Sequence, residues 1–170
     1  QDKKTGKSRQ YTANDTTNKT IAGNQVVDIK EDNKEIIWLS SFNGISGVDV
    51  ESDSIVSFNS KNGLAGNWAS PMVVDSFNRI WLGVSGGLMM LDQDRRHFKT
   101  FTLNDGLPSV GFPEHAGVHL RNGNIIFPSN NGYILFNPAN FRQEQTKPEF
   151  YIAGYSVFNK NYPAISEEEQ

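Results

Sequence analysis

The chain has 170 residues, of which 36% are hydrophobic and 21% charged, and its formal net charge is −3. This balance is typical of a soluble globular protein and excludes the large basic surface with which proteins bind nucleic acid. The absence of cysteine excludes disulfides and thiolate metal sites. Fifteen glycines and many asparagines favour a turn-rich all-β fold.

An internal repeat sets the organisation of the chain. The segments IIWLSSFNGISGVDV and RIWLGVSGGLMMLDQ align with Trp38 and Trp81 at the same position, 43 residues apart. Six further pairs match at this offset: Leu39 and Leu82, Gly44 and Gly87, Asp49 and Asp92, Phe58 and Phe101, Gly63 and Gly106, and Leu64 and Leu107. A third copy follows at an offset of 45, with Ile126 in the tryptophan position, and an earlier copy precedes at an offset of 47. This period indicates β-propeller blades.

Each repeat predicts four short strands separated by Asn, Asp and Gly residues. In the middle copy the strands cover about Ser70–Asp75, Arg79–Val84, Gly87–Asp92 and Lys99–Thr102. In the second and third strands, the residues directed to either face of the sheet are apolar, which indicates that other sheets cover both faces. We therefore expect an all-β fold, a β-propeller fragment of four-stranded antiparallel blades with Trp38 and Trp81 packed between blades.

The third copy ends differently from the others. After Asn137 no fourth strand is predicted, and a polar linker comes instead, followed by alternating residues at 149–158 that predict another β domain. A strand from elsewhere is expected to complete this last blade, because an unpaired edge is otherwise exposed. A ring of about seven blades needs roughly 300 residues at this period, so we expect the chain to be one segment of a longer protein.

These motifs resemble the two-component regulator propellers. The family pattern places a Trp-Ile/Leu-Gly-Thr turn after a strand ending in Asp, then Gly-Leu and a closing Asp-Gly-Leu-Pro-Ser-Asn turn. The chain has VVDSFNRIWLGVSGGLMMLD and FTLNDGLPS, although Ala65–Gly66 replaces Pro-Ser in the preceding closing turn. The segment GYILFNPANF resembles the family's final blade, and PEFYIAGYSVFNKNYP resembles the start of its immunoglobulin-like domain.

The resemblance implies a division of the chain into five parts. These are the end of a blade (1–24), two blades (25–66 and 67–109), the last blade (110–142), and a linker with the first strands of an immunoglobulin-like β-sandwich (143–170).

The resemblance also implies a function. It points to the periplasmic sensor region of a hybrid two-component system, a type common in Bacteroidetes, with a histidine kinase elsewhere in the protein that controls transcription. An oligosaccharide ligand, the remainder of the propeller, the immunoglobulin-like domain and a homodimer of the full-length sensor are the implied partners. No catalysis and no cofactor are expected in this segment. The alternatives are a protein-binding propeller scaffold without a small ligand and, as a third class, a propeller lyase or hydrolase.

No metal or phosphate site is predicted. The residues between His115 and His119 favour a strand, on which the two histidines lie about 13 Å apart, too far to share one metal. The glycine-rich segment Gly83–Gly87 joins strand to strand and offers no helix N-terminus to a phosphate. Asp75, Asp92 and Asp105 stand at strand ends, where turn geometry explains them.

One rim of the propeller is the predicted ligand face. The loop from an outer strand to the next inner strand lies on the same rim as the loop between the second and third strands. These loops bring a set of aromatic, amide and ionisable residues toward one surface: Asn43, Asn67, Trp68, Phe112, Glu114, His115, Asn130 and Asn131. Aromatic faces suit the C–H surfaces of sugars, and amides and carboxylates suit their hydroxyls.

Trp68 is the most distinctive residue of this set, because no other copy of the repeat has tryptophan at its position. The packing of the repeat therefore does not demand it. The alternative is that Trp68 and Phe112, which begin inner strands, simply fill the ring.

Overall fold

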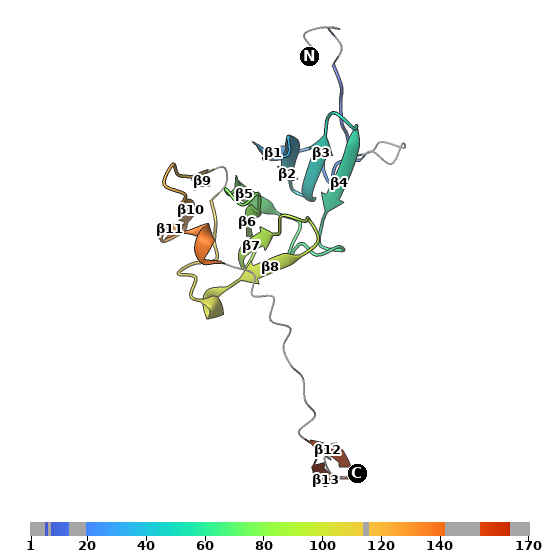
Figure 1. Ribbon diagram of the computed structural model, residues 1–170, viewed down its shortest axis with the longest axis vertical. Coiled ribbons are helices and arrows are strands. Elements are labelled where there is room, and N and C mark those ends of the chain that lie inside the picture. The colour runs from blue at the N-terminus through green and yellow to red at the C-terminus, as the bar shows by residue number, and fades with distance from the viewer. Residues whose placement is uncertain (1–5, 7, 14–19, 114–115, 142–153, 164–170) are drawn as a thin grey trace. The chain divides into compact units, whose positions relative to one another are not determined.

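The computed structural model describes residues 6, 8–13, 20–113, 116–141 and 154–163. The chain divides into two units, Gln1–Asn140 and Phe141–Gln170. The first unit contains three antiparallel sheets that follow one another along the chain (Figure 1). Among the described residues, no helix has the length and apolar character needed to cross a membrane.

The first two sheets have four strands each, paired in chain order. The first contains β1 (Val26–Glu31), β2 (Ile36–Ser41), β3 (Gly44–Asp49) and β4 (Ser54–Phe58). The second contains β5 (Ala69–Val74), β6 (Ile80–Val84), β7 (Gly87–Leu91) and β8 (Phe98–Phe101). The four strands predicted for the middle copy are confirmed to within one residue at each end.

The third sheet has three strands, in the order β11-β10-β9. They are β9 (Val118–His119), β10 (Ile125–Ser129) and β11 (Gly132–Phe136), followed by a 3₁₀ turn at Pro138–Asn140. His119 lies on a strand, as predicted. The origin of a fourth strand stays a prediction, because residues 143–147 lie outside the described part of the chain.

The two ends of the chain carry less regular structure. In the second unit, β12 (Gly154–Val157) and β13 (Lys160–Pro163) form a hairpin. Its two turn residues, Phe158 and Asn159, have φ of 48° and 60°, as a type I′ turn requires. The described residues before β1 form no strand. The blade end at 1–24 and the immunoglobulin-like domain therefore stay predictions.

The sheets pack face to face, with their first strands adjacent: β1 contacts β5, and β5 contacts β9. Every residue of β6 and β7 is buried, which confirms that the second sheet is covered on both faces. The main core lies between the first and second sheets and consists of Trp38, Ile45, Leu64, Ala69, Met72, Ile80, Leu82, Val84, Met89 and Leu91. Blades of a propeller are expected to pack in this way.

A close backbone approach explains the recurring glycine pair, Gly44 and Gly87. A Cβ atom on Gly44 would collide with the carbonyl oxygen of Phe58, and one on Gly87 would collide with that of Phe101. Gly44 also has a φ of 130°, which disfavours any side chain. The recurring glycine therefore allows the third strand to begin directly against the end of the fourth.

The two repeated tryptophans are buried between sheets, as predicted. Trp38 is 1% exposed and Trp81 is 0% exposed. The Trp81 ring lies 5.7 Å from Phe101 in its own sheet and 4.7 Å from Phe136 in the third sheet. Trp38 lies flat over Gly47, where a Cβ atom would come within 2.9 Å of the ring.

A carboxylate six residues before each tryptophan anchors its ring. Trp38 Nε1 donates a hydrogen bond of 2.9 Å to Asp32 Oδ2, and Trp81 Nε1 donates one of 2.8 Å to Asp75 Oδ2. The other oxygen of each carboxylate accepts two backbone N–H groups in the turn between the first and second strands. Each buried aspartate therefore fixes a turn and a tryptophan together. Turn geometry, the sequence-based explanation of Asp75, accounts for only one of its oxygens.

An arginine approaches each of these carboxylates, but the two arginines come from different places. Arg79, in the same turn as Asp75, places Nε 2.7 Å from Asp75 Oδ2. Arg95, from the turn between β7 and β8, places Nη2 2.6 Å from Asp32 Oδ2 in the neighbouring sheet. The first pair lies within one sheet, whereas the second connects two.

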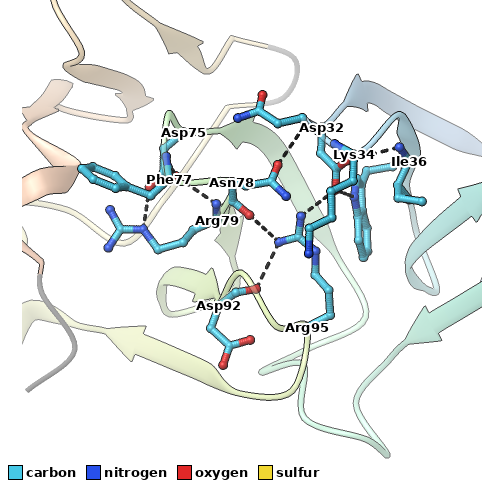
Figure 2. A network of polar contacts seen from close by, with 11 residues as sticks. Asp32, Lys34, Ile36, Asp75, Phe77, Asn78, Arg79, Asp92 and Arg95 are labelled. Atoms are coloured by element: carbon cyan, nitrogen blue, oxygen red, sulfur yellow. Dashed lines mark hydrogen bonds and ion pairs between the residues drawn. The ribbon is translucent and has the colours of Figure 1, made fainter. Parts of the chain in front are cut away.

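Arg95 is the centre of this connection, as Figure 2 shows. Its Nη1 donates to the carbonyl oxygens of Asn78 and Asp92 in the second sheet, at 2.7 and 3.1 Å. Its guanidinium carbon also lies 4.9 Å from the centre of the Trp38 ring. One side chain thus joins turns of the second sheet to the buried carboxylate of Asp32 in the first.

The protonation of Asp32 depends on this network. Burial alone would raise the pKa of its carboxyl group, but the hydrogen bonds from Trp38, Arg95 and two backbone N–H groups outweigh burial. They hold the pKa of Asp32 below its ordinary value. The carboxylate is therefore the form that the fold stabilises.

Replacing Trp81 by alanine should lower the free energy of unfolding by about 3–5 kcal/mol, because the change removes a buried ring shared by two sheets. Trp81→Phe keeps most of the bulk and should cost less. Urea unfolding followed by circular dichroism measures both changes. A loss below about 1 kcal/mol for Trp81→Ala would show that the ring does not support the packing.

The ion pair between the sheets is tested by a double-mutant cycle of Arg95→Ala and Asp32→Asn. We expect each single change to destabilise the chain, with a coupling free energy of about 1–3 kcal/mol between them. The same cycle with Arg96→Ala, an exposed neighbouring arginine, serves as control. Additive effects for Arg95 and Asp32 would contradict the connection.

The lowered pKa of Asp32 predicts a pH dependence of stability. Its contribution is complete above the unfolded-state pKa of about 3.9 and is lost as pH falls through the lower pKa of the folded state. Unfolding free energies measured between pH 6 and 2 should therefore decrease less steeply for Asp32→Asn than for the unchanged chain. Identical slopes would show that Asp32 contributes no such linkage, and Glu31→Gln, an exposed carboxylate, is the control.

Candidate ligand-binding rim

The three hairpin turns between second and third strands lie at one end of their sheets. They are Phe42–Asn43 in the first sheet, Ser85–Gly86 in the second and Asn130–Asn131 in the third. Because the strands are antiparallel, the loops that lead from one sheet into β5 and β9 reach the same end. We call this end the hairpin rim.

Two aromatic rings meet on the hairpin rim. The ring centres of Phe42 and Trp68 lie 4.2 Å apart, with an angle of 59° between their planes. Phe42 is 38% exposed and Trp68 is half-buried. Trp68 is thus neither free in solvent nor closed in the core, and part of its surface remains open.

Hydrogen bonds hold the loop that carries Trp68. Asn67 Oδ1 accepts the N–H of Ser60 at 3.1 Å, and the N–H of Leu64 donates to the carbonyl of Asn59. The Leu64 side chain is buried in the core below. Asn67, a predicted ligand residue, therefore uses its side-chain oxygen within the loop.

Phe112, which is half-buried like Trp68, lies between the second and third sheets. Its Cβ would be 2.9 Å from a Cβ atom on Gly83, and its ring makes an edge contact with buried Phe127 at 6.0 Å. This placement matches the alternative that Phe112 fills the interior. Trp68 has its aromatic contact with Phe42 on the rim, whereas Phe112 has its contact with a buried ring.

The amides of the rim are exposed at three places. Asn43, Asn130 and Asn131 all lie in hairpin turns and face solvent. Asn130 also donates its backbone N–H to the carbonyl of Gly111 at 3.1 Å, which connects this turn to the loop before Phe112. The other two predicted residues, Glu114 and His115, lie outside the described part of the chain.

Phe42 was not among the residues predicted from the sequence. It has the same distinctive feature as Trp68, an aromatic residue at a position where the other copies of the repeat have none. At the position of Phe42 the other copies have Ser85 and Asn130, and at the position of Trp68 the next copy has Gly111. Both aromatic residues depart from the repeat, and the structure places them in contact.

A pocket of about 250 Å³ lies toward the opposite end of the first sheet. Its lining comes mostly from that sheet and comprises Asp32, Lys34, Ile36, Trp38, Gly47, Asp49, Ser54, Ile55, Val56 and Arg95. The pocket reflects two differences between the repeats, because Gly47 stands where the second sheet has Met90, and Ile36 stands where it has Arg79.

The acidic groups of this pocket are already engaged. Asp32 binds Arg95, and Asp49 accepts the backbone N–H groups of Glu51 and Ser52. The hydrogen bonds from Ser52 hold the pKa of Asp49 below its ordinary value. The pocket therefore offers a mainly apolar space beside paired charges. Across the described residues, no group of three metal-ligating side chains converges there or elsewhere.

The chain is similar in sequence to a histidine kinase. No family model matches the chain. Histidine kinase P4 of Formosa agariphila is 21% identical over 102 residues, which is 60% of this chain and 7% of that protein. The chain therefore corresponds to a small part of this relative.

Two solved structures share most of the fold. The extracellular domain of a candidate hybrid two-component system of B. thetaiotaomicron, BT3049, matches 85% of this chain and 21% of its own, with a TM-score of 0.65 and 22% identity. PorZ, a surface component of the type-IX secretion system of Porphyromonas gingivalis, matches 92% of this chain and 24% of its own, with a TM-score of 0.56 and 16% identity. The chain thus has the fold found in the extracellular domain of a hybrid two-component system, which confirms the resemblance predicted from its repeats.

Proposed function

We propose that the chain is part of the ligand-sensing region of a hybrid two-component sensor, located outside the cytoplasm, and that its hairpin rim contacts an oligosaccharide. The observation that carries the proposal is the partly exposed Trp68 on a fold shared with such an extracellular domain. The histidine kinase relative supports the same class of protein.

The chemistry of the hairpin rim suits a neutral sugar. The faces of sugar rings carry C–H groups, which pack on aromatic rings, and the exposed amides of Asn43, Asn130 and Asn131 can donate to and accept from hydroxyl groups. Binding of this kind needs no titratable acid or base. A sensing role without catalysis is therefore the function that the described rim residues favour.

On this proposal, signalling uses parts of the protein beyond this segment. A bound ligand would change how the propeller contacts the immunoglobulin-like domain. In a homodimeric sensor, this change would alter the activity of a histidine kinase on the cytoplasmic side of the membrane. This chain matches only 7% of the histidine kinase relative, so most of the length of that relative lies outside the matched part.

Calorimetric titration of the intact extracellular region with cellohexaose, laminarihexaose and maltohexaose tests the proposal. We expect at least one of them to bind, and Trp68→Ala to weaken binding by about 1–3 kcal/mol, because it removes a central aromatic contact. Phe77→Ala is the matched control, since Phe77 is 48% exposed but lies in the turn between β5 and β6, at the opposite end of the sheets.

Melting curves of the same variants separate binding from folding. Trp68→Ala with unchanged affinity and a lowered melting temperature would return Trp68 to the core and contradict the proposed site. If Phe77→Ala weakens binding as strongly as Trp68→Ala, the ligand lies elsewhere. If no oligosaccharide binds, a protein-binding scaffold becomes the better description.

A further inference from the structure

Phe42 and Trp68 both differ from the residues at the equivalent positions of the other copies, and their rings are in contact. The core residues Phe58 and Phe101 match at the 43-residue offset, but neither Phe42 nor Trp68 has an aromatic counterpart in the neighbouring copies. They come from different sheets, the first from the β2–β3 turn and the second from the loop before β5. A shared role explains why both depart from the pattern where their rings meet.

The geometry of the pair is that of a support and a supported ring. The ring centres are 4.2 Å apart at an angle of 59°, so Phe42 abuts the indole at a steep angle instead of stacking flat upon it. The hydrogen-bonded loop fixes the backbone next to Trp68 through Asn67 and Ser60. The indole thus has a ring contact on one side and follows a residue whose side chain is hydrogen-bonded within the loop.

We propose that Phe42 is a positioning residue that holds Trp68 ready to stack on the apolar face of a pyranose ring. The inference rests on the proposed function and adds to it the residue that sets the orientation of Trp68. A ligand on this pair contacts both the first and the second sheet. Because Trp68 is held before the ligand arrives, binding costs less side-chain entropy than it would with a mobile indole.

The first arm of the test measures the support without a ligand. Trp38 and Trp81 are buried, so acrylamide reaches Trp68 far better than either of them. In the intact extracellular region, the signal of Trp68 is the difference between each protein and its Trp68→Phe counterpart. We expect Phe42→Ala to raise the quenching constant of Trp68 about twofold, and Phe42→Tyr, which retains the ring, to leave it unchanged.

The second arm measures binding of the hexasaccharide with the highest affinity among cellohexaose, laminarihexaose and maltohexaose. We expect Phe42→Ala to raise its Kd about three- to tenfold, and Phe42→Tyr to stay within about twofold. In a Trp68→Ala background, Phe42→Ala should have no further effect, because a residue that acts through Trp68 has nothing left to position. A general structural role for Phe42 would instead give additive losses.

Each result decides a different point. Unchanged quenching in Phe42→Ala overturns the support, and additive losses of affinity overturn the action through Trp68. Normal affinity in Phe42→Ala, with binding lost in Trp68→Ala, overturns the positioning role and leaves the proposed function standing. Failure of every hexasaccharide to bind the unchanged protein overturns the proposed function and the pyranose ligand, while the quenching arm still decides whether Phe42 supports Trp68.

Discussion

The hydrogen bond from a buried tryptophan to the aspartate six residues before it holds this structure together. In the first two sheets, one carboxylate joins a turn, a strand and a ring that packs on the next sheet. Burial of a carboxylate is costly unless its oxygens are bonded and its charge is compensated. That requirement brings an arginine to each site, and at Asp32 the arginine belongs to the neighbouring sheet. The connection between sheets thus follows from the need to compensate one buried charge.

The third sheet shows what happens when this arrangement is absent. Leu120 and Ile126 occupy the aspartate and tryptophan positions, so the carboxylate and the indole that it binds are replaced together. The turn survives, because Leu120 keeps its backbone hydrogen bonds with Asn124 and Gly123. Phe136 then contacts Trp81 of the second sheet, and Phe112, whose ring contacts Phe127, lies against Gly83 of the second sheet. Arg79 adds a hydrogen bond of 2.6 Å to the carbonyl of Pro138. The turn therefore forms without the aspartate, which in the first two sheets adds side-chain hydrogen bonds to the turn and the connection to the tryptophan.

The fold could be predicted from the sequence because the pattern of each strand occurs in more than one copy of the repeat. Strands that are apolar on both parities, such as β6 and β7, also show that both faces are covered. The repeat alone does not predict the polar network of aspartates and arginines, nor the complete aromatic pair of the hairpin rim. The repeat does not single out Asp32, and turn geometry is the only role that it indicates for Asp75, because sequence does not show which carboxylate oxygen bonds an indole. Arg95 acts 63 residues from its partner, and no local pattern connects them. Phe42 could have been found by the comparison between copies that found Trp68.

We propose different roles for the two ends of the sheets. The buried carboxylates and their arginines lie at one end, and the hairpin rim at the other end carries the aromatic pair and the exposed amides that we propose contact a ligand. A crystal structure of the intact extracellular region with a bound hexasaccharide tests this division most directly. We expect a sugar ring to lie on one face of the Trp68 indole, at a van der Waals distance of about 4 Å, with Phe42 in contact with the indole on its other side. A sugar bound at the opposite end, beside Phe77 or in the pocket near Trp38, would contradict it.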